Sequence, residues 1–86
     1  MTMTLNTVRT RIVSTARLAN SQSGNPRYVV HTLAGSFRTA LDSQAAFAVG
    51  SDSFANVGVD LFFNEDHRII GMRTEDGTHE AGTVPQ

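Results

Sequence analysis

Residues 8–18, VRTRIVSTARL, alternate regularly enough to restrict the kind of fold that the chain can adopt. Even-numbered positions carry apolar or small side chains, whereas the odd-numbered positions include Arg9, Arg11 and Arg17. Side chains of a β-strand point alternately to its two sides, so a period of two predicts a strand with one buried face. The segment therefore predicts a sheet, with the three arginines on the side that faces water.

Four further segments are rich in the β-branched and aromatic residues typical of strands. They are residues 28–33, 36–41, 56–64 and 67–73, the last two forming a hairpin. Residues 42–50, DSQAAFAVG, begin with residues that cap helices and end at a glycine, which predicts one short helix. Three strands, a short helix and two strands is the order of the five-stranded oligonucleotide/oligosaccharide-binding (OB) barrel, and an SH3-like barrel is the alternative.

The chain is expected to form one small β-barrel domain over residues 1–73, followed by a flexible acidic tail over residues 74–86. The tail, TEDGTHEAGTVPQ, is polar and acidic and shows no periodicity. A chain of 86 residues buries too little surface to enclose a deep cavity, so a site on the surface is the better expectation.

The first two predicted strands are joined by a polar loop, residues 20–26, in which Gly24 and Pro26 favour a turn. The expected register places Arg17 opposite Tyr28, close enough for the guanidinium to stack on the ring. The other pairs expected in this register are Ile12 with Leu33 and Ala16 with Val29.

Charge is divided between the two halves of the chain. Residues 1–41 hold five arginines and no acid, residues 42–86 hold eight acids and two arginines, and lysine is absent. This asymmetry suits either a basic face for an anionic partner or head-to-tail self-association. The candidate binding surface is the arginine-bearing side of the first three strands, made of Arg9, Arg11, Arg17, Arg27, Tyr28 and Arg38. Arginines in this pattern are equally typical of a solvated strand face.

Phe62, beside Asp60 in the fourth strand, is a candidate apolar contact for a partner, although it would also suit a packed position. The sequence shows no arrangement typical of catalysis or metal binding. His31, His67 and His79 lack the spacing of metal ligands, cysteine is absent, and no G-x-S-x-G motif occurs. We therefore expect no catalytic residue, no metal site and no cofactor.

The stretch SGNPRY, residues 23–28, is followed by VVHTLAGSFRTA. It resembles a loose group of small uncharacterised proteins of actinobacteria and their phages, in which an S-x-x-G-N-P-R-Y hairpin precedes a strand and a G-x-x-x-T turn. The resemblance covers residues 11–49, about half of the chain. It implies a phage or actinobacterial origin and a small accessory role, and it assigns no functional residue.

These observations predict a non-enzymatic binding module whose partner is a protein, either a host protein or a second copy of the chain. Single-stranded nucleic acid is the alternative partner, with arginines on phosphates and Tyr28 stacked on a base. The net charge of −1 argues against that alternative. The longest apolar run, residues 45–49, is too short to span a membrane, and the start lacks the pattern of a leader. A cytoplasmic location is expected, in the bacterial host if a phage encodes the protein.

Overall fold

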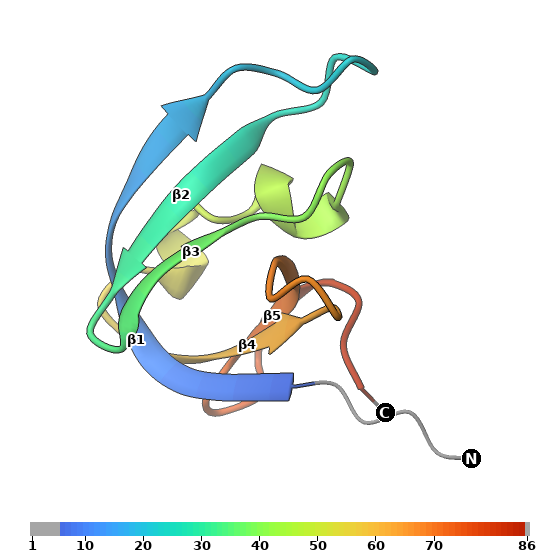
Figure 1. The fold of residues 1–86 in the computed structure, drawn as a ribbon. Coiled ribbons are helices and arrows are strands. Elements are labelled where there is room, and N and C mark those ends of the chain that lie inside the picture. The colour runs from blue at the N-terminus through green and yellow to red at the C-terminus, as the bar shows by residue number, and fades with distance from the viewer. Residues whose placement is uncertain (1–5, 86) are drawn as a thin grey trace.

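The computed structural model describes residues 6–85, which form a mainly β fold as predicted (Figure 1). The strands are β1 Asn6–Leu18, β2 Arg27–Thr32, β3 Gly35–Arg38, β4 Gly58–Phe63, β5 Ile69–Thr74 and β6 Glu80–Gly82. Two short 3₁₀ helices, η1 Gln44–Phe47 and η2 Asp52–Phe54, lie between β3 and β4. The order in the sheet is β3-β2-β1-β4-β5-β6, and every neighbouring pair is antiparallel.

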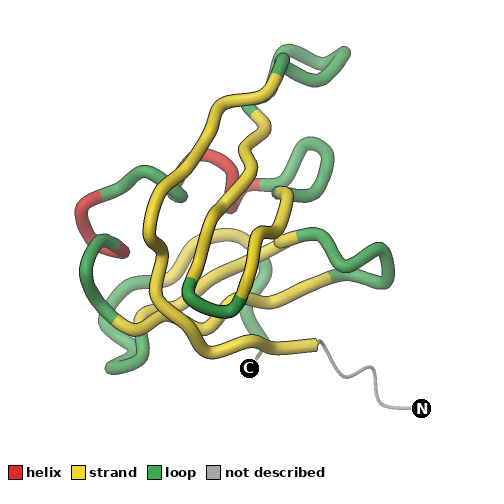
Figure 2. The backbone as a smooth tube through the Cα atoms, turned by 60° about the vertical axis from the view of Figure 1, so that its left-hand side comes forward, coloured by secondary structure: helices red, strands yellow, loops and turns green. Residues whose placement is uncertain are grey.

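β1 is thirteen residues long and pairs with a different strand along each of its halves. Asn6 to Arg11 pair with β4, and Ile12 to Leu18 pair with β2. Figures 1 and 2 show β1 as one long, strongly curved strand that passes from one part of the sheet to the other. It therefore joins a layer made of β1, β2 and β3 to a layer made of β1, β4, β5 and β6.

A β-bulge at Val13 interrupts the pairing of β1 with β2. Ile12 lies opposite Thr32 and Ser14 lies opposite His31, so Val13 is an extra residue with no residue opposite it. One extra residue exchanges the sides to which the following side chains point. The even-numbered residues of β1 point to the inner face of the sheet before the bulge, and the odd-numbered ones point to that face after it, although Val13 to Arg17 are all exposed.

The buried residues on both sides of the bulge show this exchange. Before it, Val8 lies opposite Leu61, which is completely buried. After it, Thr15 lies opposite Val30, which is also completely buried. Residues directly opposite one another in an antiparallel pair share a face of the sheet. Thr15 and Arg17 therefore lie on the inner face, contrary to the predicted alternation.

The register beyond the bulge agrees with the prediction, and the register before it differs by one residue. Arg17 lies opposite Tyr28 and Ala16 lies opposite Val29, whereas Ile12 pairs with Thr32 rather than with Leu33. The bulge explains the difference, because it adds one residue to β1 between the two segments.

The sheet does not close into the predicted five-stranded barrel. It has six strands within residues 6–85, and Thr39, the residue after β3, forms a single parallel bridge with Ile69 of β5. At this bridge the N–H of Ala40 donates a hydrogen bond of 2.8 Å to the carbonyl of Ile69. β3 is only four residues long, and the chain turns inward at Thr39 and Ala40, which are both buried. No continuous ladder can therefore form between β3 and β5.

The predicted helix over residues 42–50 is replaced by two 3₁₀ turns. Ser43 caps η1, as its hydroxyl accepts a hydrogen bond of 3.2 Å from the N–H of Ala45. Ser51 caps η2 in the same way only eight residues later. So short a segment does not repay the cost of nucleating an α-helix. η1 instead buries Ala45 and Ala46 against β5 and β6, and η2 buries Phe54.

Residues 80–82, which were expected to belong to a flexible tail, form β6 and pair with β5. The turn before β6 is organised by Asp76. Its carboxylate accepts a hydrogen bond of 3.0 Å from the N–H of Thr78, and one of 2.8 Å from each hydroxyl of Thr74 and Thr78. These bonds, the Thr78 N–H above all, lower the pKa of Asp76 to about 2. The acidic sequence here supports a turn that leads into a strand.

The core lies between the two layers. Its buried members are Val30, Ala45, Val49, Phe54, Val59, Leu61, Phe63, Ile69 and Met72. β4 contributes most, because every residue from Val59 to Phe63 is buried. Tyr28 and Phe37 pack against this cluster from β2 and β3. No helix in the described part of the chain is long and apolar enough to cross a membrane.

Gly71 in β5 offers a test of this packing. A Cβ atom at position 71 would collide with the backbone carbonyl of Thr83, which follows β6. We predict that Gly71→Ala lowers the free energy of unfolding by about 1–3 kcal/mol, measured by chemical denaturation, because backbone must move. Gly50→Ala is the control, since a Cβ atom there meets nothing within 4 Å. Equal losses of stability in the two variants would contradict the described contact of β5 with the segment after β6.

Candidate functional site

The bulge at Val13 divides the predicted arginine surface. Arg9 and Arg11 point outward from the first half of β1, opposite Asp60 and Gly58. Arg17 lies beyond the bulge, opposite Tyr28, and shares the inner face with it. The arginines of β1 therefore do not form one continuous outward-facing surface.

The two remaining arginines of the predicted set lie on the outer side of β2 and β3. Arg38 is exposed and lies opposite Val29, the β2 residue between the inward-facing Tyr28 and Val30. Arg27 begins β2, and its Nε donates a hydrogen bond of 2.8 Å to the carbonyl of Ala19. The structure thus places Arg27 and Arg38 on the side of the β1–β2–β3 layer opposite to Arg17.

Arg17 stacks on Tyr28 as the sequence predicts. The guanidinium carbon lies 5.5 Å from the centre of the ring, and the guanidinium donates a hydrogen bond of 2.7 Å to the side chain of Asn20. Tyr28 is half-buried and packs against the core. Since Arg17 and the core both cover the ring, a ligand can stack on Tyr28 only by displacing Arg17.

Arg9 is occupied by an ion pair that the sequence did not indicate. Its Nε and Nη2 donate hydrogen bonds of 2.7 and 3.0 Å to the two carboxylate oxygens of Asp60, and its Nη1 lies 3.6 Å from Glu75. The Asp60 side chain is only 7% exposed, and Arg73 approaches it at 3.9 Å from the other side. The hydrogen bonds from Arg9, aided by the charge of Arg73, lower the pKa of Asp60 although burial opposes them.

Phe62 does not offer the exposed apolar contact that was considered for it. The residue is 2% exposed, and the guanidinium carbon of Arg73 lies 5.4 Å from the centre of its ring. The outward side of β4 is therefore covered by arginine side chains, which stabilise Asp60 by charge and Phe62 by a cation–π contact. Arg9 and Arg73 help to build the fold and are not free to bind a partner.

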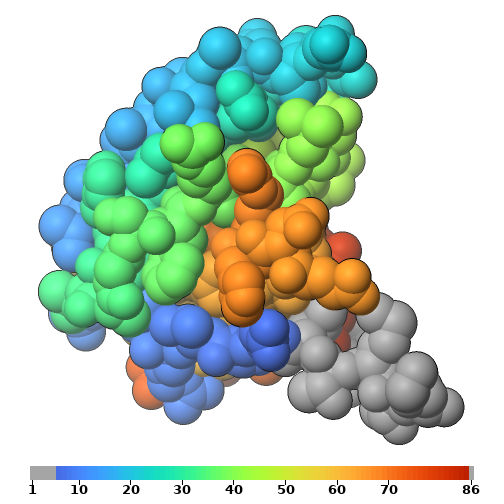
Figure 3. Space-filling view, in the orientation of Figure 1, coloured from blue at the N-terminus to red at the C-terminus, as the bar shows by residue number. Residues whose placement is uncertain are grey.

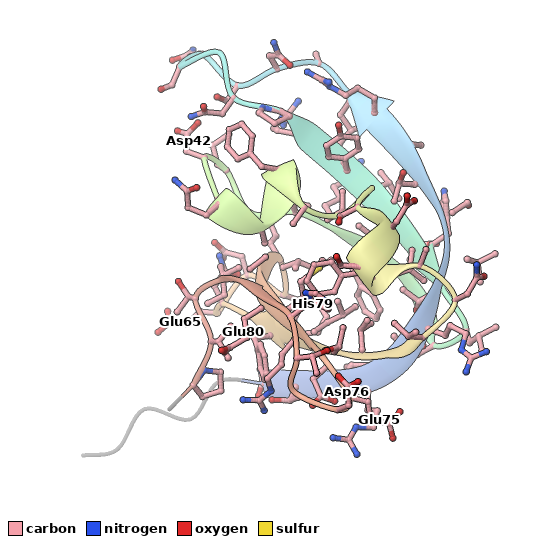
Figure 4. The ribbon with its side chains drawn as sticks, turned by 180° about the vertical axis from the view of Figure 1, so that it is seen from behind. Asp42, Glu65, Glu75, Asp76, His79 and Glu80 are labelled. Atoms are coloured by element: carbon pink, nitrogen blue, oxygen red, sulfur yellow. The ribbon has the colours of Figure 1, made fainter. Side chains whose placement is uncertain are left out.

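The loop between β1 and β2 is held in place by Asp42, at the far end of the molecule from Glu75 and Asp76 (Figure 4). The Asp42 carboxylate accepts hydrogen bonds of 2.6 Å from the hydroxyl of Ser21 and 2.8 Å from the amide of Asn25. These bonds lower its pKa, the one from Ser21 most strongly. The backbone of Asp42 has a φ of 56°, a conformation that non-glycine residues adopt at a cost. The loop is thus an ordered part of the surface.

Exposed apolar side chains gather around the bulge. Val13 is 63% exposed, Leu33 is 75% exposed and Val57 is 39% exposed. All three flank Arg11. The N–H of Leu33 donates to the carbonyl of Arg11, and Val57 precedes Gly58, which lies opposite Arg11. We call Arg11, Val13, Leu33 and Val57 the bulge surface.

The bulge surface is hollowed beside Arg11. A depression of about 440 Å³ lies between Arg9, Arg11, Leu33 and Glu75. In Figure 3 the β2–β3 turn that carries Leu33 meets the blue atoms of β1 along the margin of the molecule. Within residues 6–85 the Arg11 guanidinium forms no ion pair, in contrast to Arg9. A cationic group surrounded by exposed apolar side chains therefore lies at the edge of a shallow depression.

A larger depression, of about 660 Å³, lies on the other side of Arg11. Its lining includes Asp52, Asp76 and His79, but the Asp76 carboxylate is already engaged by the turn before β6. Among the described residues, no three histidine, aspartate or glutamate side chains converge as metal ligands would. The hydroxyls of Thr74 and Thr78 that line it donate hydrogen bonds to the Asp76 carboxylate, which organises the turn.

Comparison with known proteins identifies no relative: no protein-family model, no curated protein and no solved structure matches the chain.

The ion pair between Arg9 and Asp60 yields a prediction about stability and pH. Asp60→Asn should lower the free energy of unfolding by about 2 kcal/mol at pH 7, because a charge-assisted hydrogen bond is lost at a buried site. The pKa of Asp60 in the folded protein lies below its ordinary value of 3.8. The stabilisation is therefore complete above that pH and is lost as the pH falls through the folded-state pKa.

The measurement is denaturation of the wild type and the variant at several pH values between 7 and the acid limit of folding. The difference between their free energies of unfolding should shrink below about pH 4. Asp66→Asn serves as the control, since Asp66 lies exposed in the β4–β5 turn. A stability difference for Asp60→Asn that does not change with pH would show that its charge is not what stabilises the fold.

Proposed function

We propose that the protein is a non-enzymatic binding module that recognises a protein partner through the bulge surface. The observation that carries the proposal is the exposure of Val13 and Leu33 beside Arg11, which forms no ion pair within residues 6–85. Contiguous apolar side chains at the surface of a small protein are typical of interaction sites. Arginine next to apolar anchors is enriched at the centres of protein–protein interfaces. A partner that suits this surface carries a carboxylate among apolar side chains.

The strand arrangement supports an OB-like rather than an SH3-like fold for this module. β1 lies between β2 and β4, and β3 approaches β5 in parallel at the Thr39–Ile69 bridge. An OB fold is a partly open barrel of five strands, and here β6 adds a sixth strand beside β5. Such a scaffold hosts many different ligands, so the fold does not name the partner.

The resemblance of residues 11–49 to small actinobacterial and phage proteins supports an accessory role, with a host protein or a second copy as partner. In this proposal the protein acts in the cytoplasm, which is that of the bacterial host if a phage encodes it.

Leu33 tests the bulge surface directly. The protein is immobilised, bacterial lysate is passed over it, and retained proteins are quantified by mass spectrometry. Leu33→Ser should reduce retention of the main partner about tenfold or more, because a central apolar anchor is lost. Its melting temperature should stay close to that of the wild type, since the side chain is 75% exposed.

The matched control is Phe47→Ser, in which another exposed apolar side chain is removed, from η1. Phe47→Ser should retain the partner as the wild type does. Equal retention by the Leu33→Ser variant, or the absence of any specifically retained protein, would count against the proposal.

Single-stranded nucleic acid remains a second candidate partner, favoured by the charge distribution. Within residues 6–85 no ion pair involves Arg11, Arg17, Arg27 or Arg38, and the three ion pairs that occur all include Arg9 or Arg73. Arginines without acidic partners on the β1–β2–β3 layer are suited to phosphate contacts. The division of these arginines between two sides of the layer weakens this candidate, because one strand of nucleic acid cannot follow both.

A gel-shift experiment with single-stranded oligonucleotides longer than about 16 nucleotides decides this candidate. If the arginines contact phosphates, binding is strongest at about 50 mM salt and falls steeply by about 200 mM, because bound counterions are released. Arg38→Gln should weaken the shift without lowering stability, since this side chain is exposed. No shift at the lower salt concentration would eliminate nucleic acid as a partner.

A further inference from the structure

The second half of β1 has one edge without a partner strand. β4 pairs with β1 only as far as Arg11, and the single bridge between Ile12 and Ala55 follows. Beyond Ile12, β1 pairs within the described chain with β2 alone. Every residue from Val13 to Arg17 is exposed, and in Figure 1 this part of β1 follows the outer margin of the molecule.

The hydrogen bonds of β2 show which groups of β1 face the open edge. The carbonyl of Tyr28 accepts a hydrogen bond from the N–H of Thr39, so the backbone groups of Tyr28 point toward β3. Successive residues of a strand direct their N–H and C=O groups to opposite sides, so those of Val29 point toward β1. Val29 lies opposite Ala16, which therefore bonds to β2.

By the same alternation, Thr15 and Arg17 direct their N–H and C=O groups away from β2, toward the open edge. These two residues present two donors and two acceptors in a line. Between them lies Ala16, a small residue whose own backbone groups are occupied by β2. The edge is therefore a short template for one more antiparallel strand.

The edge lacks some of the features that keep exposed strands from pairing. Such edges in monomeric proteins are protected by lysine, by proline, by inward-pointing charges, by β-bulges or by a covering loop. The segment VSTA before Arg17 contains no charge and no proline, and β-branched residues favour an extended strand. Only the bulge at Val13 and the side chain of Arg17 limit the edge at its two ends. The backbone groups between these two ends are therefore open to a further strand.

We propose that the open edge of β1 pairs with the same edge of a second copy of this chain. The two strands run antiparallel about a two-fold axis that passes between the two Ala16 residues. Thr15 of each copy exchanges both backbone hydrogen bonds with Arg17 of the other, which makes four intermolecular hydrogen bonds. The inference goes beyond the proposed function, because it concerns the open edge of β1 and not the bulge surface.

This register is favoured over its neighbours by the groups that the edge presents. Centring the axis on Thr15 leaves the Arg17 backbone groups facing the bulge at Val13, so only one hydrogen-bonded pair forms. Centring it on Arg17 places the two guanidinium groups opposite one another, which is unfavourable. With the axis at Ala16, each Arg17 lies opposite Thr15 of the second copy, and the facing alanines allow close approach.

This register predicts that a negative and a positive charge at position 15 have opposite effects on dimerisation. A glutamate there lies opposite Arg17 of the second copy, and an arginine there repels it. Thr15→Glu should tighten dimerisation about fivefold and Thr15→Arg should weaken it about fivefold, measured by sedimentation velocity over concentrations up to about 1 mM. The two variants change the same exposed position, so similar melting temperatures would exclude a general effect on folding.

Amide hydrogen exchange followed by NMR identifies the interface. As protein concentration rises, exchange at the N–H groups of Thr15 and Arg17 should slow, because they gain partners. The N–H of Ala16 is bonded to β2 in the monomer as well, so its exchange should be slow at every concentration.

Three results would overturn the inference. They are a monomer up to about 1 mM, a dimer in which the Thr15 and Arg17 amides stay fast, and equal effects of the Glu and Arg variants. A strict monomer that still retains a lysate protein through Leu33 would remove this inference and leave the proposed function in place. A dimer with slowed Thr15 and Arg17 amides, together with a Leu33→Ser variant that retains every lysate protein, would remove the proposed function and leave this inference in place.

Discussion

The β-bulge at Val13 is the constraint on which the rest of the structure depends. β1 has to pair with β4 along its first half and with β2 along its second half. The extra residue allows the strand to bend and changes the orientation of every residue that follows. It places Thr15 and Arg17 on the inner face and turns their backbone groups toward the open edge. Both the position of Arg17 over Tyr28 and the template for a second copy follow from this one residue.

Burial and charge are coupled on the outward side of β4. Asp60 and Phe62 belong to the side of the strand that would face water, yet both are buried. Arg9 and Arg73 cover them, and their aliphatic stems exclude water while their guanidinium groups neutralise the carboxylate. The arginines of the first half of the sequence do not form a single basic surface. Arg9 is engaged by Asp60, and Arg17 lies on the opposite side of the β1–β2–β3 layer from Arg27 and Arg38.

Local patterns were sufficient to predict most of the strands. The alternation of residues 8–18, the β-branched run of β2 and the hairpin of β4 and β5 all correspond to observed elements, and the stacking of Arg17 on Tyr28 is confirmed. The bulge could not be read from the sequence, since VST contains neither glycine nor a break in the alternation. The pairing of Arg9 with Asp60, 51 residues apart, depends on tertiary structure alone.

The candidate site was harder to predict than the fold because it is defined by exposure. Val13 lies on the odd-numbered side of β1 that the alternation assigns to water, whereas Leu33 was expected to face Ile12 and is left at the surface by the β2–β3 turn. Phe62 could be either a contact for a partner or a packed residue from its sequence alone, and the structure buries it with Arg73 over its ring. Sequence patterns identify which side chains alternate, but the packing of distant segments decides which side is covered.

The distances between Hα protons across β1 and β2, measured by nuclear Overhauser effects, test the bulge most directly. Opposite residues that do not exchange hydrogen bonds have their Cα atoms about 4.5 Å apart, compared with about 5.5 Å for hydrogen-bonded pairs. Strong Hα–Hα effects are expected for Ile12 with Thr32 before the bulge and for Thr15 with Val30 after it, because neither pair exchanges hydrogen bonds. If β1 continued from Ile12 without a bulge, Ser14 would lie opposite Val30 and Ala16 would lie opposite Tyr28. Strong effects for these two pairs, in place of Thr15 with Val30, would contradict the bulge.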